Sequence, residues 1–167
     1  MTSFPQPFGS EYSPEILAGN AACDQLNSLL RGEISAAETY KMAIDKLSES
    51  DRARESDCQC LRDMQEDHGR AAQWLRSRIR ELGGEASDSS GAWGALAKSV
   101  EGTAKIFGYA AALKGLKEVE EHGLKEYQDA LDKVDTTSRS MIESEFIPAQ
   151  QRHIMTLDSM INSASRA

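Results

Sequence analysis

Carboxylate, amide and imidazole side chains interrupt four otherwise apolar helical stripes in this sequence. Each stripe has an apolar residue at every third or fourth position, and the interruptions fall in the middle of the stripes. Carboxylates and imidazoles that meet inside a helical bundle are suitable ligands for a divalent cation. An i,i+3 pair on one helix directs both side chains toward the same point. The interrupting residues are Glu33, the pair Gln65 and His68, Glu120, and the pair Gln150 and His153.

The polar pattern occurs twice along the chain. Glu33 lies seven residues before Tyr40, and Glu120 lies seven residues before Tyr127. In each half a glutamine follows, and a histidine stands three residues after it. We therefore expect an approximately twofold bundle to bring these groups to one region of the core. Tyr40 and Tyr127 are expected to hydrogen-bond the carboxylates there.

Two interpretations of this polar cluster are open at the level of the sequence. A carboxylate buried alone is costly, and a second carboxylate facing it increases the cost. A divalent cation removes the cost because it takes the carboxylates and the imidazoles as ligands. In the alternative, the same residues form a metal-free hydrogen-bond network that satisfies the polar groups and determines the register of the helices.

The first two helices are predicted within residues 21–82, which contain no proline and consist mainly of strong helix formers. The polar cluster Lys46–Asp51 divides this stretch in two. Residues 1–20 contain three of the four prolines and form the predicted N-terminal tail. Residues 21–165 form the predicted single domain, in which no alternating pattern typical of a strand occurs.

The last two helices are predicted after the glycine- and serine-rich loop Gly83–Gly91. A long crossover with a short helix is expected between the second and third helices, and the third extends to about Val134. Thr136–Ser138 is expected to cap a fourth helix, in which Pro148 predicts a kink or a late start. Short connections within each pair favour antiparallel neighbours, so the predicted fold class is an all-α antiparallel four-helix bundle.

Composition and charge argue against several classes of function. The 167 residues carry a net charge of −8, which disfavours nucleic acid or an anionic membrane as the main partner. No apolar run approaches the roughly 20 residues that span a bilayer, and the N-terminus lacks the features of a secretory signal. The three cysteines form no disulfide framework, so we expect a cytoplasmic protein. The expected partner is a second copy in a homodimer, together with a protein partner that the sequence does not identify.

The segment Gly32–Tyr40 resembles the first-helix motif of rubrerythrins, in which a ligand glutamate follows a glycine and a tyrosine comes seven residues later. The four-helix pattern extends from about Leu26 to Ile161 and resembles the ferritin-like superfamily of rubrerythrin and bacterioferritin type. It is most similar to bacterial ferritin-like domain families of unassigned function. The resemblance implies iron, zinc or manganese as the cofactor. It implies as ligands Glu33, His68, Glu120 and His153.

Gln65 and Gln150 depart from this resemblance because they stand where the superfamily has bridging glutamates. A neutral amide oxygen binds metal weakly and does not bridge two ions well. The two glutamines therefore argue against a standard di-iron centre and favour a single ion or no metal. If the helix phase differs by a residue or two, ligands would instead come from acids such as Glu66, Asp67 or Glu118.

Two functions follow from these alternatives, and the sequence leaves open whether the protein is an enzyme. The first is a ferritin-like metal-binding protein with iron-dependent oxidation or peroxide chemistry. The second is a non-catalytic helical bundle with a stress or scaffold role. The doubled glutamate and histidine pattern favours the first, and glutamine in place of glutamate favours the second.

Overall fold

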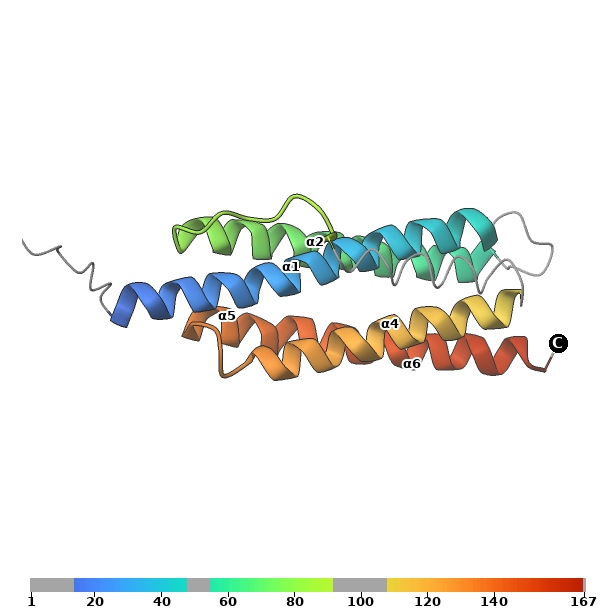
Figure 1. The fold of residues 1–167 in the computed structure, drawn as a ribbon. Helices are drawn as coiled ribbons and strands as arrows, with labels where there is room; N and C mark the ends of the chain where they lie inside the picture. The colour runs from blue at the N-terminus through green and yellow to red at the C-terminus, as the bar shows by residue number, and fades with distance from the viewer. Residues whose placement is uncertain (1–13, 48–54, 92–107, 167) are drawn as a thin grey trace, which may run out of the picture.

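The structure is a computed structural model that describes residues 14–47, 55–91 and 108–166. Regular structure within these ranges is entirely helical (Figure 1). None of the helices in the described part of the chain is both long and apolar enough to cross a lipid bilayer. The elements are α1 (Pro14–Leu47), α2 (Glu55–Glu81), α4 (Tyr109–Ala130), α5 (Thr136–Met141), the π-helical segment η2 (Ile142–Phe146) and α6 (Ile147–Ala164).

The helices form a four-helix bundle in which α5, η2 and α6 together make up the fourth rod. α1 packs against α2, α4 packs against α6, and α1 contacts α4 between the two pairs. The members of each pair are antiparallel, while α2 and α4 run in the same direction (Figure 1). The predicted all-α four-helix bundle is confirmed. The predicted crossover helix and the predicted tail as far as residue 13 lie outside the described residues.

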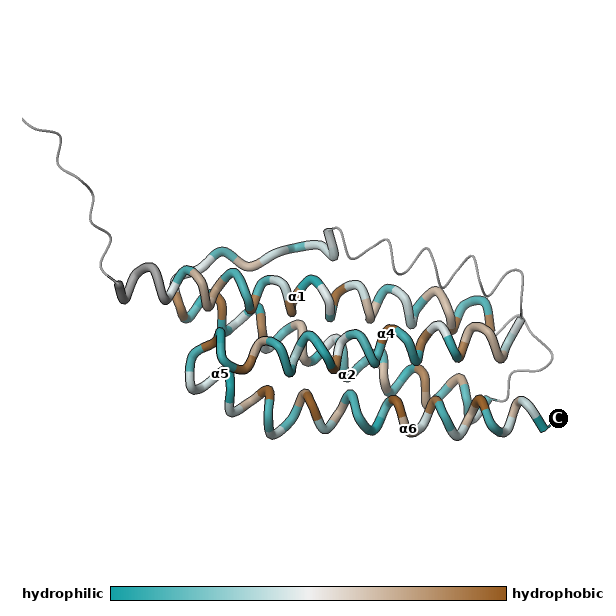
Figure 2. The backbone as a smooth tube through the Cα atoms, turned by 60° about the horizontal axis from the view of Figure 1, so that its bottom comes forward, coloured by the Kyte–Doolittle hydropathy of each residue, from teal (hydrophilic) through white to brown (hydrophobic). Residues whose placement is uncertain are grey.

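The apolar core lies in two clusters along the bundle, and the polar residues lie between them. On α1, for example, Leu30 belongs to one cluster and Tyr40 to the other, with Glu33 between them. On α4, Leu116 and Ala130 flank Glu120 in the same way. Apolar positions recur along each helix and are interrupted by hydrophilic ones (Figure 2). Because the helices are aligned side by side, their interruptions meet at one level of the bundle.

Two helix starts differ from the positions expected from the sequence. α1 begins at Pro14 rather than near residue 21, because proline is favoured in the first turn, where its missing N–H has no partner to lose. The N-cap of α5 is Asp135 rather than the segment Thr136–Ser138. The Asp135 carboxylate accepts hydrogen bonds from the backbone N–H groups of Thr137 at 3.0 Å and Ser138 at 3.2 Å.

Pro148 is accommodated by the π-helical segment η2, which directly precedes α6. Proline lacks an N–H, and its ring would clash with the carbonyl four residues earlier in a regular helix. The wider turn of η2 relieves this conflict, and Pro148 lies in the first turn of α6. The irregularity expected at Pro148 is therefore a π-helical segment within a continuous rod, and Gln150 and His153 follow on the regular helix α6.

Asp135→Ala is expected to destabilise the protein by about 1–2 kcal/mol, because the substitution removes a helix cap. The carboxylate also pairs with Arg78 of α2 at 2.7 Å, in a partly buried position. Chemical denaturation monitored by circular dichroism measures the loss. Asp132→Ala is the matched control, since Asp132 is almost fully exposed and its pair with Arg139 caps no helix. Equal losses for the two variants would contradict a capping role.

Candidate functional site

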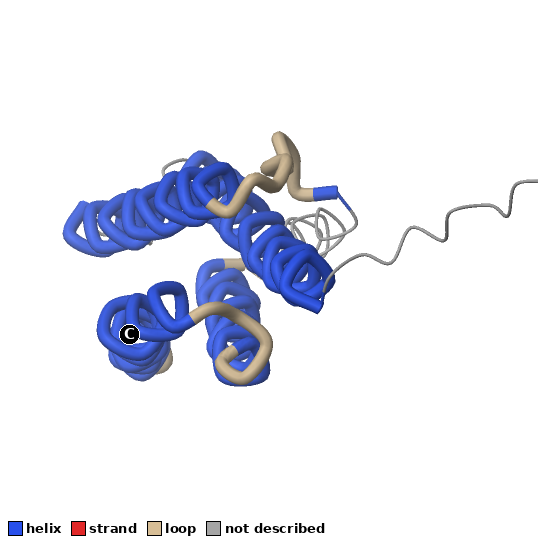
Figure 3. Tube along the Cα trace, turned by 90° about the vertical axis from the view of Figure 1, so that its left-hand side faces the viewer, coloured by secondary structure: helices blue, strands red, loops and turns tan. Residues whose placement is uncertain are grey.

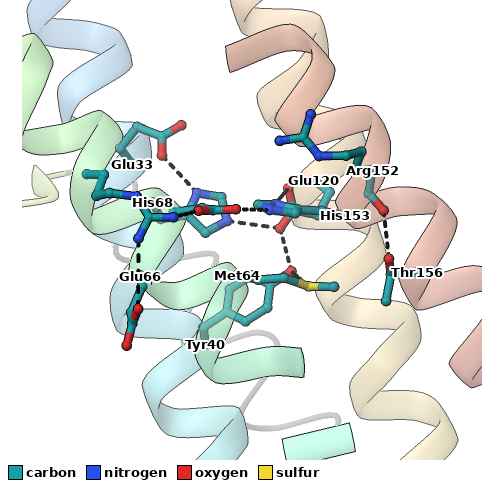
Figure 4. A network of polar contacts seen from close by, with 11 residues as sticks. Glu33, Tyr40, Met64, Glu66, His68, Glu120, Arg152, His153 and Thr156 are labelled. Atoms are coloured by element: carbon teal, nitrogen blue, oxygen red, sulfur yellow. Dashed lines mark hydrogen bonds and ion pairs between the residues drawn. The ribbon is translucent and has the colours of Figure 1, made fainter. Parts of the chain in front are cut away.

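Four of the predicted ligand residues meet at the level between the two apolar clusters. Figure 3 shows the two helix pairs one above the other, and each of the four rods contributes one of these side chains. All four are buried, with Glu120 fully inaccessible and none more than 5% exposed. Figure 4 shows them directed toward one another. They are Glu33 of α1, His68 of α2, Glu120 of α4 and His153 of α6.

His68 lies between two buried carboxylates. Its Nδ1 is 2.8 Å from Oε2 of Glu33, and its Nε2 is 2.9 Å from Oε1 of Glu120. Burial lowers the pKa of His68, but the attraction of the two carboxylates outweighs burial and raises this pKa to about 10. In the metal-free protein His68 is therefore an imidazolium at neutral pH, and it balances part of the buried negative charge.

Glu120 is the most connected member of the cluster. Besides His68 it contacts His153, whose Nδ1 lies 3.2 Å from Oε2 of Glu120. Burial raises the pKa of Glu120, but the two histidines outweigh burial and lower this pKa to about 2. The rings of His68 and His153 are 5.4 Å apart between centroids, so both imidazoles lie within reach of the Glu120 carboxylate.

The two tyrosines bind the two glutamates in a crossed arrangement. The Tyr127 hydroxyl donates a hydrogen bond to Oε1 of Glu33 at 2.7 Å, and the Tyr40 hydroxyl donates to Oε1 of Glu120. Each tyrosine thus donates a hydrogen bond to the glutamate of the other half of the chain. Burial and the nearby carboxylates raise the pKa of both tyrosines well above its usual value. Both hydroxyls therefore stay protonated and donate hydrogen bonds to the carboxylates, as expected from the sequence.

The two glutamines occupy different environments. Gln150 is buried, and with its amide nitrogen facing α4 it donates to the Glu120 carboxylate and to the Glu120 backbone oxygen at 3.1 Å. Gln65 is only half-buried, and the structure does not bring it to the cluster. Met64 takes the inward position instead, with its Sδ 3.4 Å from the Tyr40 hydroxyl oxygen. Met64 and Gln65 both lie close to the helix face of His68. Burial of the apolar thioether costs less free energy than burial of the amide.

Asp67 belongs to the cluster although the repeated pattern does not include it. Its Oδ2 lies 3.1 Å from Nε2 of His153, which joins α2 to α6. Of the three neighbouring acids considered for a shifted helix phase, Asp67 alone reaches the cluster. Glu66 and Glu118 are exposed. The only signal for Asp67 in the sequence is its position beside His68.

A cleft of about 920 Å³ leads to the cluster between α2 and the fourth rod. One wall is aromatic, with Trp74 and Phe146 in an edge-to-face contact at 5.6 Å between centroids. Its lining also includes Gln150 and His153 on α6 and the charged groups Asp67, His68 and Arg70 on α2. The cleft therefore offers an ion or a small molecule a route to the buried groups. The cluster residues that line it are Glu33, Asp67, His68, Gln150 and His153.

The donor set fits a single divalent ion. His68, Glu120 and His153 offer one ligand atom each, and these atoms lie within 4.8 Å of one another. Ligands at about 2.0–2.2 Å from a common zinc ion are separated by about 3–4 Å, so the side chains need to close by only about 1 Å. Two imidazoles and one carboxylate bind zinc in hydrolytic enzymes and ferrous iron in oxygenases. Gln65 and Gln150 carry no charge, and Gln65 lies outside the cluster, so the cluster offers no further pair of carboxylates on α2 and α6 that could bridge to a second ion.

The fold and this cluster define a class of protein, namely a helical bundle with a buried carboxylate–imidazole centre. Residues 21–133 match the family described as Domain of unknown function (DUF2383), and the chain belongs to this family. The matched region includes Glu33, His68 and Glu120 and ends before His153. No curated protein matches the chain. No solved structure matches it either.

Proposed function

We propose that this protein is a ferritin-like metal-binding protein that holds one divalent ion of iron, zinc or manganese in its core. His68, Glu120 and His153 are the ligands. The observation that supports this most strongly is the convergence of their buried ligand atoms from three helices to within 4.8 Å. In the described part of the chain no lysine or arginine is buried, so only the histidines are available to compensate the charges of Glu33 and Glu120. A divalent ion would complete this compensation.

The direction of the helices supports the ferritin-like assignment. α2 and α4 run in the same direction, so the chain must return along the bundle between them (Figure 1). One long crossover of this kind is typical of ferritin-like bundles. The second support is the order of residues along the chain, since glutamate, tyrosine and histidine recur at matching levels in both halves.

Several residues would hold the ligand side chains in place around a bound ion. The Tyr40 hydroxyl and the Gln150 amide hold the Glu120 carboxylate, and the Tyr127 hydroxyl holds Glu33 beside His68. His68 must release a proton to become a ligand, so metal binding should compete with protonation. The ion would supply Lewis-acid chemistry or, in the case of iron, redox chemistry.

A second candidate function is a metal-free bundle with a stress or scaffold role. It is favoured by one specific observation, namely that every ring nitrogen of His68 and His153 already lies within 3.2 Å of a carboxylate oxygen. With His68 protonated, such a network satisfies the buried groups without an ion. In that case the hydrogen-bond network would determine the register of the helices in the bundle.

Assembly and location remain predictions that accompany this proposal. We propose a homodimer as the assembly, because the sequence favours a second copy as partner. We propose the cytoplasm as the location. Its support is that Cys23, Cys58 and Cys60 are all free thiols in the structure.

Metal content tests the proposed function. Protein treated with a chelator, loaded anaerobically with ferrous, zinc or manganous ions and desalted, is expected to retain about one ion per chain by elemental analysis. His153→Gln should lose the ion, because it removes an imidazole ligand. His122→Gln is the matched control, since His122 is exposed on α4 outside the cluster. Wild-type protein that retains none of the three ions would contradict the proposal and favour the metal-free bundle.

A further inference from the structure

Asp67 belongs to the cluster but lies outside the proposed ligand set. Its side chain is 30% exposed and lines the cleft, whereas His153, to which it binds, is buried. Their 3.1 Å contact joins Oδ2 of Asp67 to Nε2 of His153 across the interface between α2 and α6. The other carboxylate oxygen of Asp67 pairs with Arg70 on the same helix. A carboxylate held at the edge of the cleft thus reaches a buried imidazole on the opposite helix.

The two nitrogens of His153 face different carboxylates. An ionised carboxylate only accepts hydrogen bonds, so Nε2 must carry a proton in order to bind Asp67. In a neutral imidazole Nδ1 then carries the lone pair, and this atom lies 3.2 Å from Oε2 of Glu120. Two acceptors at this distance require a positive charge between them, which is supplied by a proton or by a cation.

His68 shows no such asymmetry. Both of its nitrogens lie within 2.9 Å of buried glutamates, Glu33 on one side and Glu120 on the other. The partners of His153 differ instead, because Glu120 is fully buried and Asp67 is partly exposed. Because the Glu120 carboxylate already binds the Tyr40 hydroxyl and Nε2 of His68, Asp67 is the acceptor that remains for the proton of His153.

We infer that Asp67 is a positioning residue that keeps the proton of His153 on Nε2 and leaves Nδ1 free to bind an ion together with Glu120. This inference rests on the proposed function, because it assigns the ligand atom for the proposed ion. A carboxylate on the far nitrogen of a ligand histidine orients the ring and increases its basicity. Asp67 does both from outside the set of residues that contact the ion.

Zinc affinity, measured by competition with a chromogenic chelator, gives the first test. Asp67→Ala removes the acceptor and is expected to weaken zinc binding by about 10–100-fold. Asp67→Asn retains an acceptor oxygen without the charge and should show a smaller loss. Asp63→Asn is the matched control, because Asp63 is exposed one turn earlier on α2 and binds Gln59 on the same helix. Wild-type affinity in Asp67→Ala would overturn the inference.

Nitrogen-15 NMR of the histidine side chains gives a readout that loss of packing alone would not change. His153, assigned by its absence in His153→Gln, should carry a proton on Nε2 in wild-type protein with and without zinc, whereas Nδ1 should carry a proton only without zinc. In Asp67→Ala the proton on Nε2 should exchange rapidly or be lost, while circular dichroism shows an intact fold. An unchanged Nε2 signal in Asp67→Ala overturns the inference.

The two proposals fail in different ways. Wild-type protein without stoichiometric zinc contradicts the proposed function. The metal-free spectra of wild type and Asp67→Ala still decide whether Asp67 sets the proton position of His153. Wild-type protein that binds zinc through Nε2 of His153 would leave the metal site intact and overturn the role of Asp67.

Discussion

Glu120→Gln is expected to abolish stoichiometric metal binding while leaving the bundle folded. The amide retains the shape of the carboxylate but loses its charge and half of its acceptor capacity. Mutation of a residue that only supports a metal ligand lowers metal affinity by about 10–100-fold. Loss of the Glu120 carboxylate, a ligand itself, should therefore lower the affinity by more than about 100-fold. Metal titration followed by elemental analysis measures the effect. Retention of the ion at wild-type affinity would show that Glu120 is not a ligand.

Truncation at the same position should also affect the stability of the metal-free protein. Glu120→Ala leaves His68 and His153 without their shared partner and opens a cavity at a fully buried site. Removal of one member of a buried charge pair costs about 3–5 kcal/mol, and we expect a loss of this size in the free energy of unfolding. Glu121→Gln and Glu121→Ala are the matched controls, because Glu121 is the next residue and is exposed beside Lys117.

The metal-free protein is expected to be most stable between about pH 4.5 and pH 6.5, and to lose stability on both sides. Folding raises the pKa of His68 from 6.5 to about 10. Its contribution is therefore complete below pH 6.5 and is lost as the pH rises toward 10. Folding lowers the pKa of Glu120 from 4.5 to about 2. Its contribution is complete above pH 4.5 and is lost as the pH falls toward 2.

Denaturant unfolding in the presence of a chelator, from about pH 3 to about pH 10, measures this profile. His68→Gln should flatten the alkaline side, since the titrating imidazole is removed. Glu120→Gln should flatten the acid side. Saturating zinc should reduce the alkaline loss, because the ion replaces the proton on His68. A wild-type profile that is flat between pH 6.5 and pH 10 would contradict the protonated state assigned to His68.

Hydrophobic periodicity predicted the helices and their pairing because each stripe must be buried against another. Leu30, Leu61, Leu116 and Leu157, one from each predicted stripe, are fully buried. The predicted helix boundaries were less accurate, because a boundary depends on one or two capping residues, whereas the apolar periodicity is summed over a whole helix. α1 begins at Pro14, about two helical turns before the expected start near residue 21, and Asp135 replaces the expected cap of α5.

The level of the candidate site was also predictable from the sequence. A buried polar residue is costly, so one that interrupts each of four apolar stripes must find partners at its own level. The near-equal spacing in the two halves places Glu33, His68, Glu120 and His153 at one level, where the structure brings them together. The repeat also predicted hydrogen bonds from Tyr40 and Tyr127 to the carboxylates, but only the structure shows that each tyrosine binds the glutamate of the other half.

The amino-acid sequence by itself determined four helices, an apolar face on each and the polar residues that interrupt those faces. Only the tertiary structure decided which of these residues bond to one another. Positions three and four residues before His68 lie near the same helix face, and packing against Tyr40 selects Met64 over Gln65. Asp67 finds its partner His153 on another helix. That pairing depends on the rotation of both helices about their axes, which spacing along one chain segment does not specify.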